Sequence, residues 1–182
     1  MDKHIDAPLV REQIQSLRAG DTVFLSGTIY TGRDAAHKKL CEMIKAGKDL
    51  PFDIRNQVIY YAGPCPAKPG DPIGSCGPTT SYRMDAYAPM LCDLGLIGMI
   101  GKGQRGQDVI DAIARNGGVY FAATGGAGAL IARSVKAAKV IAFDELGAEA
   151  VRELQVENLP LIVAIDAHGG NLYLDGPAKY CE

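Results

Sequence analysis

The chain has 182 residues, of which 47% are hydrophobic and 22% charged, so it can bury a substantial core and is not a disordered tail. Nineteen Lys and Arg against 21 Asp and Glu give a net charge of −2, which provides no global attraction to nucleic acid or to an anionic membrane. No apolar run reaches the roughly 20 residues of a membrane helix, and the charged N-terminus lacks the apolar centre of a signal peptide. We therefore expect one domain over residues 1–182, located in the cytoplasm.

The cysteines and histidines show no metal-ligand spacing. The odd number of cysteines and the absence of a CxxC pair argue against a disulfide framework and favour reduced thiols. Three scattered histidines give no zinc site. We expect this chain to bind no metal through its own residues. The five cysteines are Cys41, Cys65, Cys76, Cys92 and Cys181.

Apolar runs and helical patterns alternate along the chain, which predicts an α/β fold. Short apolar runs bounded by Gly, Pro or charged residues predict strands at 22–25, 58–62, 96–100, 119–122, 140–143 and 161–165, with a further short strand at 172–174. Helical periodicity predicts helices over 32–46, 78–94, 107–115, 127–137 and 148–155. A proline- and glycine-rich loop over 63–77 is long enough to be functional or a hinge.

The first predicted helix has a readable start and end. Thr31 and Asp34 have the spacing of a capping box, and Gly47 is placed to end the helix. Arg33 and His37 are four residues apart, so we expect them on one side of the first turns, near the end of the preceding strand.

The segment GSCGPTTSYRMDAY carries polar residues that a purely structural interpretation does not require. Gly77–Pro78 favours a helix start, and Thr79 and Arg83 would then share one stripe near the amide-rich end of the helix. This arrangement suits a carboxylate or a phosphate. The alternative is that Thr79 only caps the helix and Arg83 only reaches solvent.

Further polar residues follow other predicted strands. Arg33, Lys102 and His168 each come after an apolar run, and ligands of open α/β sheets bind outside the carboxyl ends of strands. Two arginines and a lysine that converge there would suit a small dicarboxylate, and a phosphate-bearing ligand equally well.

The run ATGGAGAL resembles a dinucleotide-binding turn only in part. Its spacing is GGxG and not GxGxxG, so close packing of a strand-to-helix turn is the better interpretation. Nucleotide binding stays as a minor alternative.

Several motifs, taken together, resemble a known family. SGTIYTGRDAAHKKL, GPCPAKPGDPIGSCGPTTSYRMDAY, IGKG, GGVYFAATGGAGALIA and LIVAIDAHGGNLY resemble, in that order, the beta subunit or C-terminal domain of iron–sulfur-dependent class I fumarate hydratases. The L(+)-tartrate dehydratase beta subunit shares much of this pattern. The resemblance covers roughly residues 20–173 and implies a swivelling β/β/α three-layer domain.

The resemblance also implies a function. It indicates reversible hydration of fumarate to malate, with a [4Fe-4S] cluster ligated by a separate alpha subunit and not by this chain. It assigns Thr79 as the catalytic base and Arg33, Arg83 and Lys102 as substrate-binding residues, with His37 as a further substrate-binding residue. We expect a hetero-oligomer with that alpha subunit.

Two alternatives stay open from the sequence. The first is the L(+)-tartrate dehydratase beta subunit, whose substrate carries an extra hydroxyl. The second is a non-catalytic module that binds an anion or a nucleotide, which the retention of all four polar site residues argues against.

Overall fold

The computed structural model describes residues 2–180, so Cys181 lies outside the described residues. The strands are β1 (Lys3–Ala7), β2 (Thr22–Thr31), β3 (Val58–Tyr60), β4 (Gly98–Gly101), β5 (Val119–Ala122), β6 (Val135–Ala142) and β7 (Val151–Ile165). The helices are α1 (Arg11–Gln15), α2 (Asp34–Lys45), α3 (Ala88–Asp93), α4 (Gln107–Asn116), α5 (Gly128–Ser134) and α6 (Leu172–Ala178), with 3₁₀ turns η1 (Ser81–Met84) and η2 (Asp144–Glu149).

The sheet closes into a small barrel. Strands β2, β3, β4 and β5 are parallel neighbours, β5 pairs antiparallel with β7, and β7 returns to pair antiparallel with β2. β1 extends the sheet from the first half of β2, and β6 extends it from the first half of β7. The long strands β2 and β7 therefore contribute to both β layers of the barrel.

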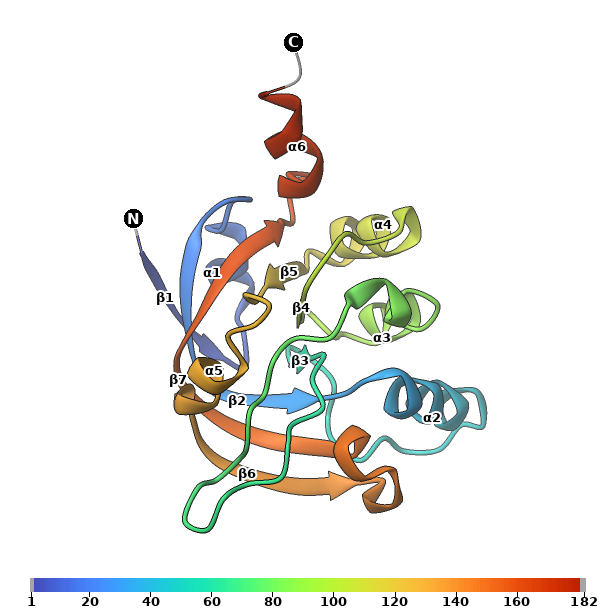
Figure 1. The fold of residues 1–182 in the computed structure, drawn as a ribbon. Helices are drawn as coiled ribbons and strands as arrows, with labels where there is room; N and C mark the ends of the chain where they lie inside the picture. The colour runs from blue at the N-terminus through green and yellow to red at the C-terminus, as the bar shows by residue number, and fades with distance from the viewer. Residues whose placement is uncertain (1, 181–182) are drawn as a thin grey trace.

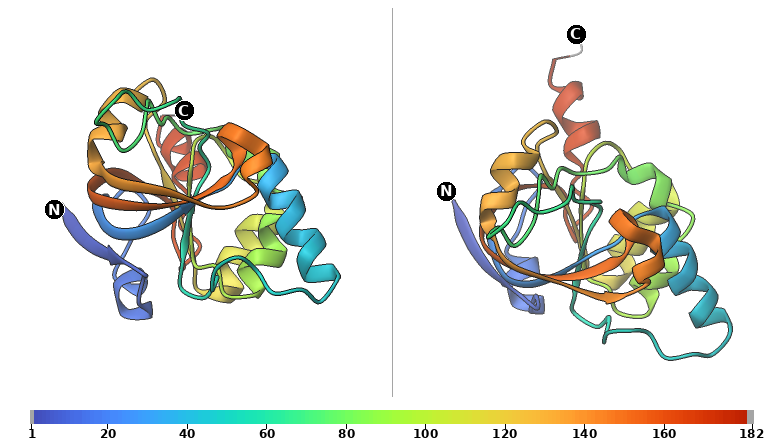
Figure 2. Two further views of the ribbon diagram at one scale, coloured as in Figure 1. Left: turned by 90° about the horizontal axis from the view of Figure 1, so that it is seen from below. Right: turned by 60° about the horizontal axis from the view of Figure 1, so that its bottom comes forward.

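Helices α2, α3 and α4 form a third layer, stacked against one side of the barrel (Figures 1 and 2). The order of layers is β/β/α, and the α/β class expected from the sequence is confirmed. α6 projects from the body near the C-terminus (Figure 1).

Alternation along β3 fills two cores. Val58 and Tyr60 point into the core between the β layers, and Ile59 points into the core beneath the helices. Leu40 of α2 and Leu91 of α3 complete the second core. Both faces of this central strand are buried, which explains why its sequence is a continuous apolar run.

The helix predicted over 78–94 is wrong in its first part. The backbone of Pro78 bridges to Ala62, and that of Thr80 bridges to Lys102, so residues 78–80 are extended. The chain then forms η1 and, after a turn, α3. Hydrogen bonds to neighbouring strands replace the local helical ones, and Thr79 does not lie at a helix N-terminus.

Three other predicted elements differ from the structure. The helix predicted over 148–155 is the start of β7, whose pairing with β2 and β6 overrides the local pattern. The helix predicted over 127–137 ends earlier, because β6 begins at Val135. The strand predicted at 172–174 is the start of α6, which the Asn171 side chain caps by accepting from the Tyr173 amide at 3.1 Å.

Of the two predicted ends of α2, the C-terminal end is confirmed and the N-terminal cap is wrong. Gly47 follows the helix with φ +64°, as a terminating glycine does. The proposed cap at Thr31 is wrong, because the N-cap is Arg33. The Thr31 hydroxyl is buried and accepts instead from the Arg152 amide at 3.0 Å, which ties β2 to β7.

Candidate active site at the carboxyl edge of the sheet

The carboxyl ends of β2, β3, β4 and β5 lie along one edge because these strands are parallel neighbours. Arg33 follows β2, the 63–77 loop and Thr79 follow β3, and Lys102 follows β4. The topology therefore brings these residues, far apart in sequence, to the edge where α/β folds bind ligands.

Arg33 and Arg83 are brought together through one carboxylate. Arg83 donates from Nε to Asp34 Oδ1 at 2.8 Å, and Arg33 Nε lies 3.9 Å from Asp34 Oδ2. Arg33 Nη2 also lies 3.3 Å from Glu149 Oε1. Arg33 Nε and Asp34 Oδ2 are buried without a hydrogen-bond partner among the described residues. Two guanidinium groups are thus held side by side with part of their donor capacity unused.

A glycine makes room for the Arg33 side chain. A Cβ on Gly63 would lie 2.9 Å from Arg33 Nη1 and 3.1 Å from its Cδ. A Cβ there would crowd the Arg33 side chain, so glycine at this position lets the guanidinium lie against the first residue of the 63–77 loop.

His37 is next to Arg33 but does not reach the surface. Its ring is fully buried, with Nδ1 2.9 Å from the Arg33 carbonyl oxygen and an edge-on contact to Tyr61 at 5.2 Å between centroids. Burial lowers the pKa of His37 to about 4, against the opposing effect of the Arg33 carbonyl. The ring is therefore neutral at pH 7, Nδ1–H donates to Arg33, and His37 supports the start of α2.

Thr79 and Lys102 are held by their backbones. The Thr79 amide donates to the Tyr61 carbonyl at 2.6 Å, and neighbouring Thr80 forms a parallel bridge with Lys102. The Lys102 side chain is exposed and extends over the loop after β5, where a Cβ on Gly125 would lie 3.9 Å from its Nζ. The chain thus keeps Thr79 and Lys102 on adjacent segments at the same edge.

His168 does not join this group. β7 runs antiparallel to β5, so its carboxyl end lies at the opposite edge from Lys102. The His168 ring contacts the Gln15 carbonyl through Nε2 at 3.0 Å. The expectation that His168 converges with the other residues is wrong, because the sequence did not show that the last strand is antiparallel.

Sequence reasoning missed the acidic partners of the arginines. Asp34 directly follows Arg33 and could have been found from the Arg–Asp pair alone. Glu149 lies over a hundred residues away and approaches because η2 packs against α2, where its carboxylate also accepts from the Ala35 amide at 3.1 Å.

No group of three or more His, Cys, Asp or Glu residues within residues 2–180 is arranged to hold a metal ion. Cys41, Cys76 and Cys92 are buried, and burial raises the pKa of Cys76 to about 12 and that of Cys92 to about 11. Cys65 is exposed. The described residues therefore do not fit as the ligand set of an iron–sulfur cluster.

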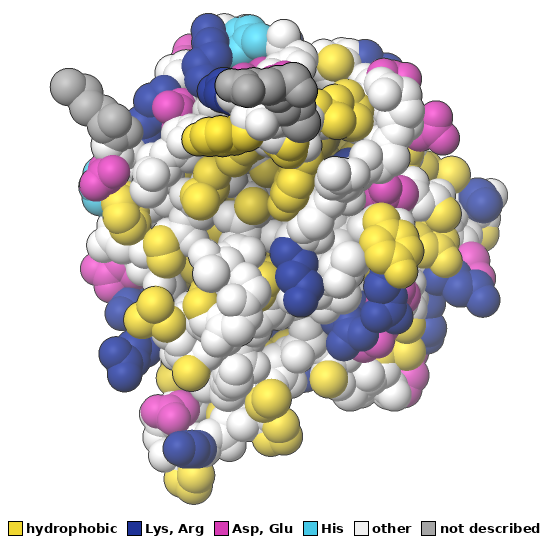
Figure 3. Space-filling model, turned by 45° about the horizontal axis from the view of Figure 1, so that its top comes forward, with side chains coloured by type: hydrophobic (Ala, Val, Ile, Leu, Met, Phe, Trp, Pro, Cys, Tyr) yellow, Lys and Arg dark blue, Asp and Glu magenta, His cyan; other side chains and the backbone are white. Residues whose placement is uncertain are grey.

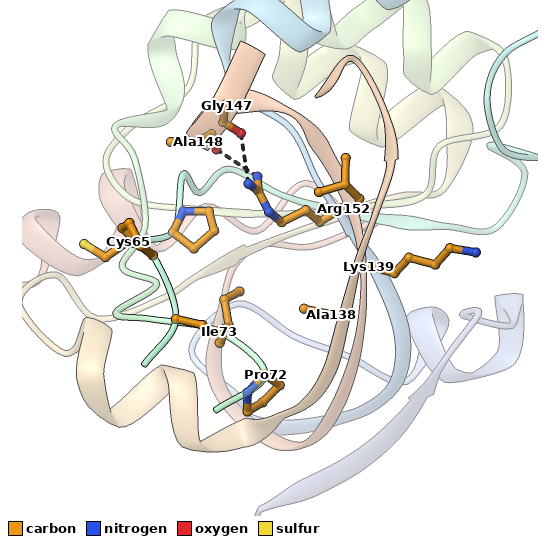
Figure 4. A pocket seen from close by; sticks show the side chains of 12 residues that line it. Cys65, Pro72, Ile73, Ala138, Lys139, Gly147, Ala148 and Arg152 are labelled. Atoms are coloured by element: carbon orange, nitrogen blue, oxygen red, sulfur yellow. Dashed lines mark hydrogen bonds between the residues drawn. The ribbon is translucent and has the colours of Figure 1, made fainter. Parts of the chain in front are cut away.

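A hollow of about 470 Å³ lies elsewhere, between the 63–77 loop and β6 (Figure 4). Arg152 faces it, but its guanidinium donates to the Gly147 and Ala148 carbonyls at 2.9 and 3.1 Å. Lys139 extends away from it (Figure 4). Its walls are otherwise mostly proline, alanine and valine or isoleucine, which does not suit a dicarboxylate.

Packing explains one glycine of the run after β5, Gly128; a Cβ on Gly125 would make only ordinary contacts, and Gly126 has φ +81° with open space around it. A Cβ on Gly128 would lie 2.5 Å from Ser75 Oγ and 2.9 Å from the Gly77 amide nitrogen. The start of α5 is therefore pressed against the end of the 63–77 loop, so the packing interpretation is confirmed for Gly128.

Charge is mixed on the face shown in Figure 3, where Lys and Arg side chains are interspersed with Asp and Glu and do not form one continuous basic patch. Within the described part of the chain, no helix combines the length and apolar character needed to cross a membrane.

Fold and site together define the class: an α/β domain with a barrel, a helical layer, and cationic side chains gathered at the carboxyl edge of its parallel strands. The chain belongs to the family described as Fumarase C-terminus, whose model matches residues 2–176.

Its relatives include separate subunits and longer chains. It is 44% identical over 180 residues to a putative L(+)-tartrate dehydratase subunit beta of Methanocaldococcus jannaschii, covering 96% of this chain and 92% of that one. It is 41% identical over 171 residues to the anaerobic class I fumarate hydratase of Escherichia coli K12, covering 93% of this chain and 31% of that one. Fumarate hydratase 2 of Leishmania major is 39% identical over 166 residues, covering 90% of this chain and 29% of that one. The chain thus spans about a third of these two fumarate hydratases.

Proposed function

We propose that this chain is the beta subunit of a hydro-lyase that interconverts fumarate and (S)-malate in a site shared with an alpha subunit. The observation that carries the proposal is the pair of guanidinium groups held at Asp34, at the carboxyl edge of a domain that belongs to the fumarase C-terminal family. Fumarate and malate each carry two carboxylates, which arginine binds in a bidentate manner.

The cations divide the work of binding and charge stabilisation. Arg33 and Arg83 bind the substrate carboxylates through nitrogens that the internal pairs leave unused. Lys102 follows β4, is joined to Thr80 through the backbone, and adds a positive charge at the same edge of the sheet. When the C3 proton leaves malate, negative charge spreads onto the neighbouring carboxylate, and preorganised cations stabilise that charge more than they stabilise the substrate.

Thr79 moves the proton. In dehydration its deprotonated oxygen takes the C3 proton, the C3–H electron pair forms the C2=C3 double bond, and the C2–O bond breaks to release hydroxide. The hydroxide takes the proton from Thr79 and leaves as water, which restores the base; in hydration the same steps run in reverse. A threonine hydroxyl is a weak base in water, and the nearby cations favour its deprotonated form. We assign His37 a supporting role: it fixes the backbone of Arg33 and is too buried to contact substrate itself.

The remaining parts of the enzyme come from a partner. The fumarate hydratases above are about three times the length that this chain matches, so we propose that a separate alpha subunit supplies the rest. That subunit would hold the [4Fe-4S] cluster, for which the described residues of this chain offer no ligand set. From the sequence we also propose that the complex is cytoplasmic.

L(+)-tartrate is the second candidate substrate. It is supported by the 44% identity to a putative tartrate dehydratase beta subunit that this chain matches over nearly its full length. Its dehydration would use the same cations and the same proton transfer, with room required for one more hydroxyl.

The test is to co-purify this chain with its cellular partner under anaerobic conditions, reconstitute the cluster, and compare rates on fumarate, malate and L-tartrate. We expect fumarate and malate to be the fastest substrates. Preference for tartrate would support the second candidate. A loaded complex that acts on none of them would contradict a hydro-lyase function, and tight nucleotide binding by the chain would then favour the non-catalytic alternative.

A further inference from the structure

Arg105 is a buried charge that the roles above do not use. Its side chain has no exposed surface, and Nε donates to Asp85 Oδ1 at 2.7 Å. Its guanidinium carbon lies 5.3 Å from the ring centroid of Tyr61 and 5.0 Å from that of Tyr120, within cation–π range of both rings. Nη2 also approaches the Tyr61 hydroxyl at 3.4 Å. Arg105 is therefore enclosed by the residue that follows β3, by β5 and by the segment after η1.

The partners of Arg105 hold two separate segments. Asp85 accepts a second hydrogen bond, from the Gly106 amide at 2.6 Å, which fixes the start of α4. The Tyr120 hydroxyl lies 2.8 Å from Ser81 Oγ and donates to the Gly103 carbonyl at 2.9 Å. One ring thus contacts the start of η1 and the loop after β4.

These two segments carry three of the proposed site residues. Thr79 lies on the extended residues 78–80 and Arg83 lies on η1, both before Asp85 in the chain. Lys102 lies three residues before Arg105. The segments are also joined directly, by the Ser81 amide donating to the Lys102 carbonyl at 2.9 Å. Loss of the Arg105 contacts would therefore leave this one backbone bond, with the Ser81–Tyr120–Gly103 contacts, to hold Thr79 and Arg83 in place relative to Lys102.

Stability alone does not require a charge at this position. Removing a guanidinium from water is costly, and apolar residues of similar volume often replace buried ion pairs without loss of stability. The planar guanidinium of arginine, in contrast, can donate to a carboxylate and contact two aromatic rings from different segments at once, which fixes their mutual geometry.

We propose that Arg105 is a positioning residue that sets the placement of the Thr79–Arg83 segment relative to Lys102, acting through Asp85, Tyr61 and Tyr120. The catalytic consequence rests on the proposed function, whereas the placement itself is a property of this chain.

The first test measures placement in the chain without reference to activity. Amide hydrogen exchange of Arg105→Met is compared with wild type at Ser81 and Gly106, and at the reference amides of Leu9 and Val163, which bond elsewhere in the fold. We expect exchange at least about tenfold faster at Ser81 and Gly106, with the reference amides changed by less than about twofold. Unchanged exchange at Ser81 and Gly106, or equal acceleration at all four amides, would overturn the proposal.

A matched control uses a second arginine, in the last turn of α4. Arg115 pairs with Asp93 at 2.8 Å but is half exposed, so Arg115→Met removes an arginine–aspartate pair without touching either site segment. We expect wild-type exchange at Ser81 and Gly106 in this variant. Arg105→Lys keeps the positive charge but loses the planar guanidinium. We expect this variant to fold, with exchange rates at Ser81 and Gly106 between those of wild type and Arg105→Met. If Arg105→Met does not fold, the same comparison is made with Arg105→Lys.

The second test uses the reconstituted complex. Misplacing the proton-transfer group should lower kcat for fumarate about 100-fold in Arg105→Met while KM changes less than about threefold, because a small misplacement affects the transition state most. Wild-type kcat in a variant with faster local exchange would overturn the catalytic part. A wild-type complex without hydro-lyase activity would instead contradict the proposed function. The amide exchange at Ser81 and Gly106 would then be the test of whether Arg105 positions the two segments.

Discussion

The Thr79 side chain can be shortened without disturbing the chain that holds it. Its anchor is the backbone amide, which donates to the Tyr61 carbonyl and does not depend on the side chain. We therefore expect Thr79→Ala to fold like wild type while kcat in the reconstituted complex falls at least about 100-fold, since a positioned proton-transfer group contributes about 10²–10⁴-fold. Thr80→Ala is the matched control, and we expect it to keep most of the activity. Equal effects of the two substitutions would argue against Thr79 as the base.

His37 should make the stability of the domain depend on pH. Its pKa is lowered from 6.5 to about 4 by burial, so between these values the unfolded chain binds a proton that the folded chain does not. The free energy of unfolding contributed by this group is therefore complete above about pH 6.5 and is lost as the pH falls to about 4, by roughly 3 kcal/mol.

The measurement is denaturant unfolding of wild type and His37→Asn at several pH values between 4 and 7. Asparagine keeps an amide donor near the position of Nδ1 but has no titrating group, so the difference between the two proteins should shrink as the pH falls. His168→Asn serves as the control, because the His168 ring is exposed; this variant should keep the wild-type dependence of the free energy of unfolding on pH. A constant difference between His37→Asn and wild type would show that the ring does not titrate in this range.

For single residues, the sequence predicted which side chains lie at the candidate site better than it predicted their contacts. Arg33, Thr79, Arg83 and Lys102 follow predicted strands or a glycine–proline step, so their place at one edge could be inferred from the chain order. The carboxylate of Glu149 and the enclosed guanidinium of Arg105 could not be found this way, because their partners lie on distant segments.

Among the elements, those with a single dominant pattern were predicted closely. β5 matches the predicted 119–122 strand, and α4 extends the predicted 107–115 helix by one residue. The helix predicted over 148–155 is wrong, since the start of β7 pairs on both sides and follows its neighbours instead of its own periodicity. β1 and α1 were not predicted at all, although Ile5 and Ile14 are fully or nearly buried in the core between the β layers.

The contact between α5 and the 63–77 loop gives a prediction at the element scale. Gly128→Ala would place a methyl group 2.9 Å from the backbone nitrogen of Gly77, so the loop or the helix must shift. We expect a loss of about 1–3 kcal/mol in the free energy of unfolding, as for other overpacked sites. Gly125→Ala is the control, since its nearest contact would be 3.7 Å from the flexible Lys102 side chain. Denaturant unfolding of both variants would check this, and equal stability would show that the contact is looser than described.

For the whole molecule, the layered architecture could be predicted from the alternation of strands and helices, but closure of the barrel could not. Closure depends on β7 pairing with both β2 and β5, and the sequence signal for β7 covered only its last residues. The same closure places the predicted site at an edge of the molecule and not in an enclosed cavity, since the Arg83 and Lys102 side chains retain solvent contact.

A half-exposed cationic edge without a metal ligand set should not catalyse hydration alone. We expect the purified chain to fold, to show no visible absorbance from a cluster, and to turn over neither fumarate nor L-tartrate, because its cations can bind carboxylates but the described residues complete no metal site. Adding the loaded alpha subunit should restore turnover and saturate at a fixed ratio of the two chains, since a shared active site requires a stable interface of about 1,200 Å² or more. Titration of one chain against the other, followed by fumarate absorbance, provides the measurement. Turnover or cluster absorbance from this chain alone would contradict the division of the site between two subunits.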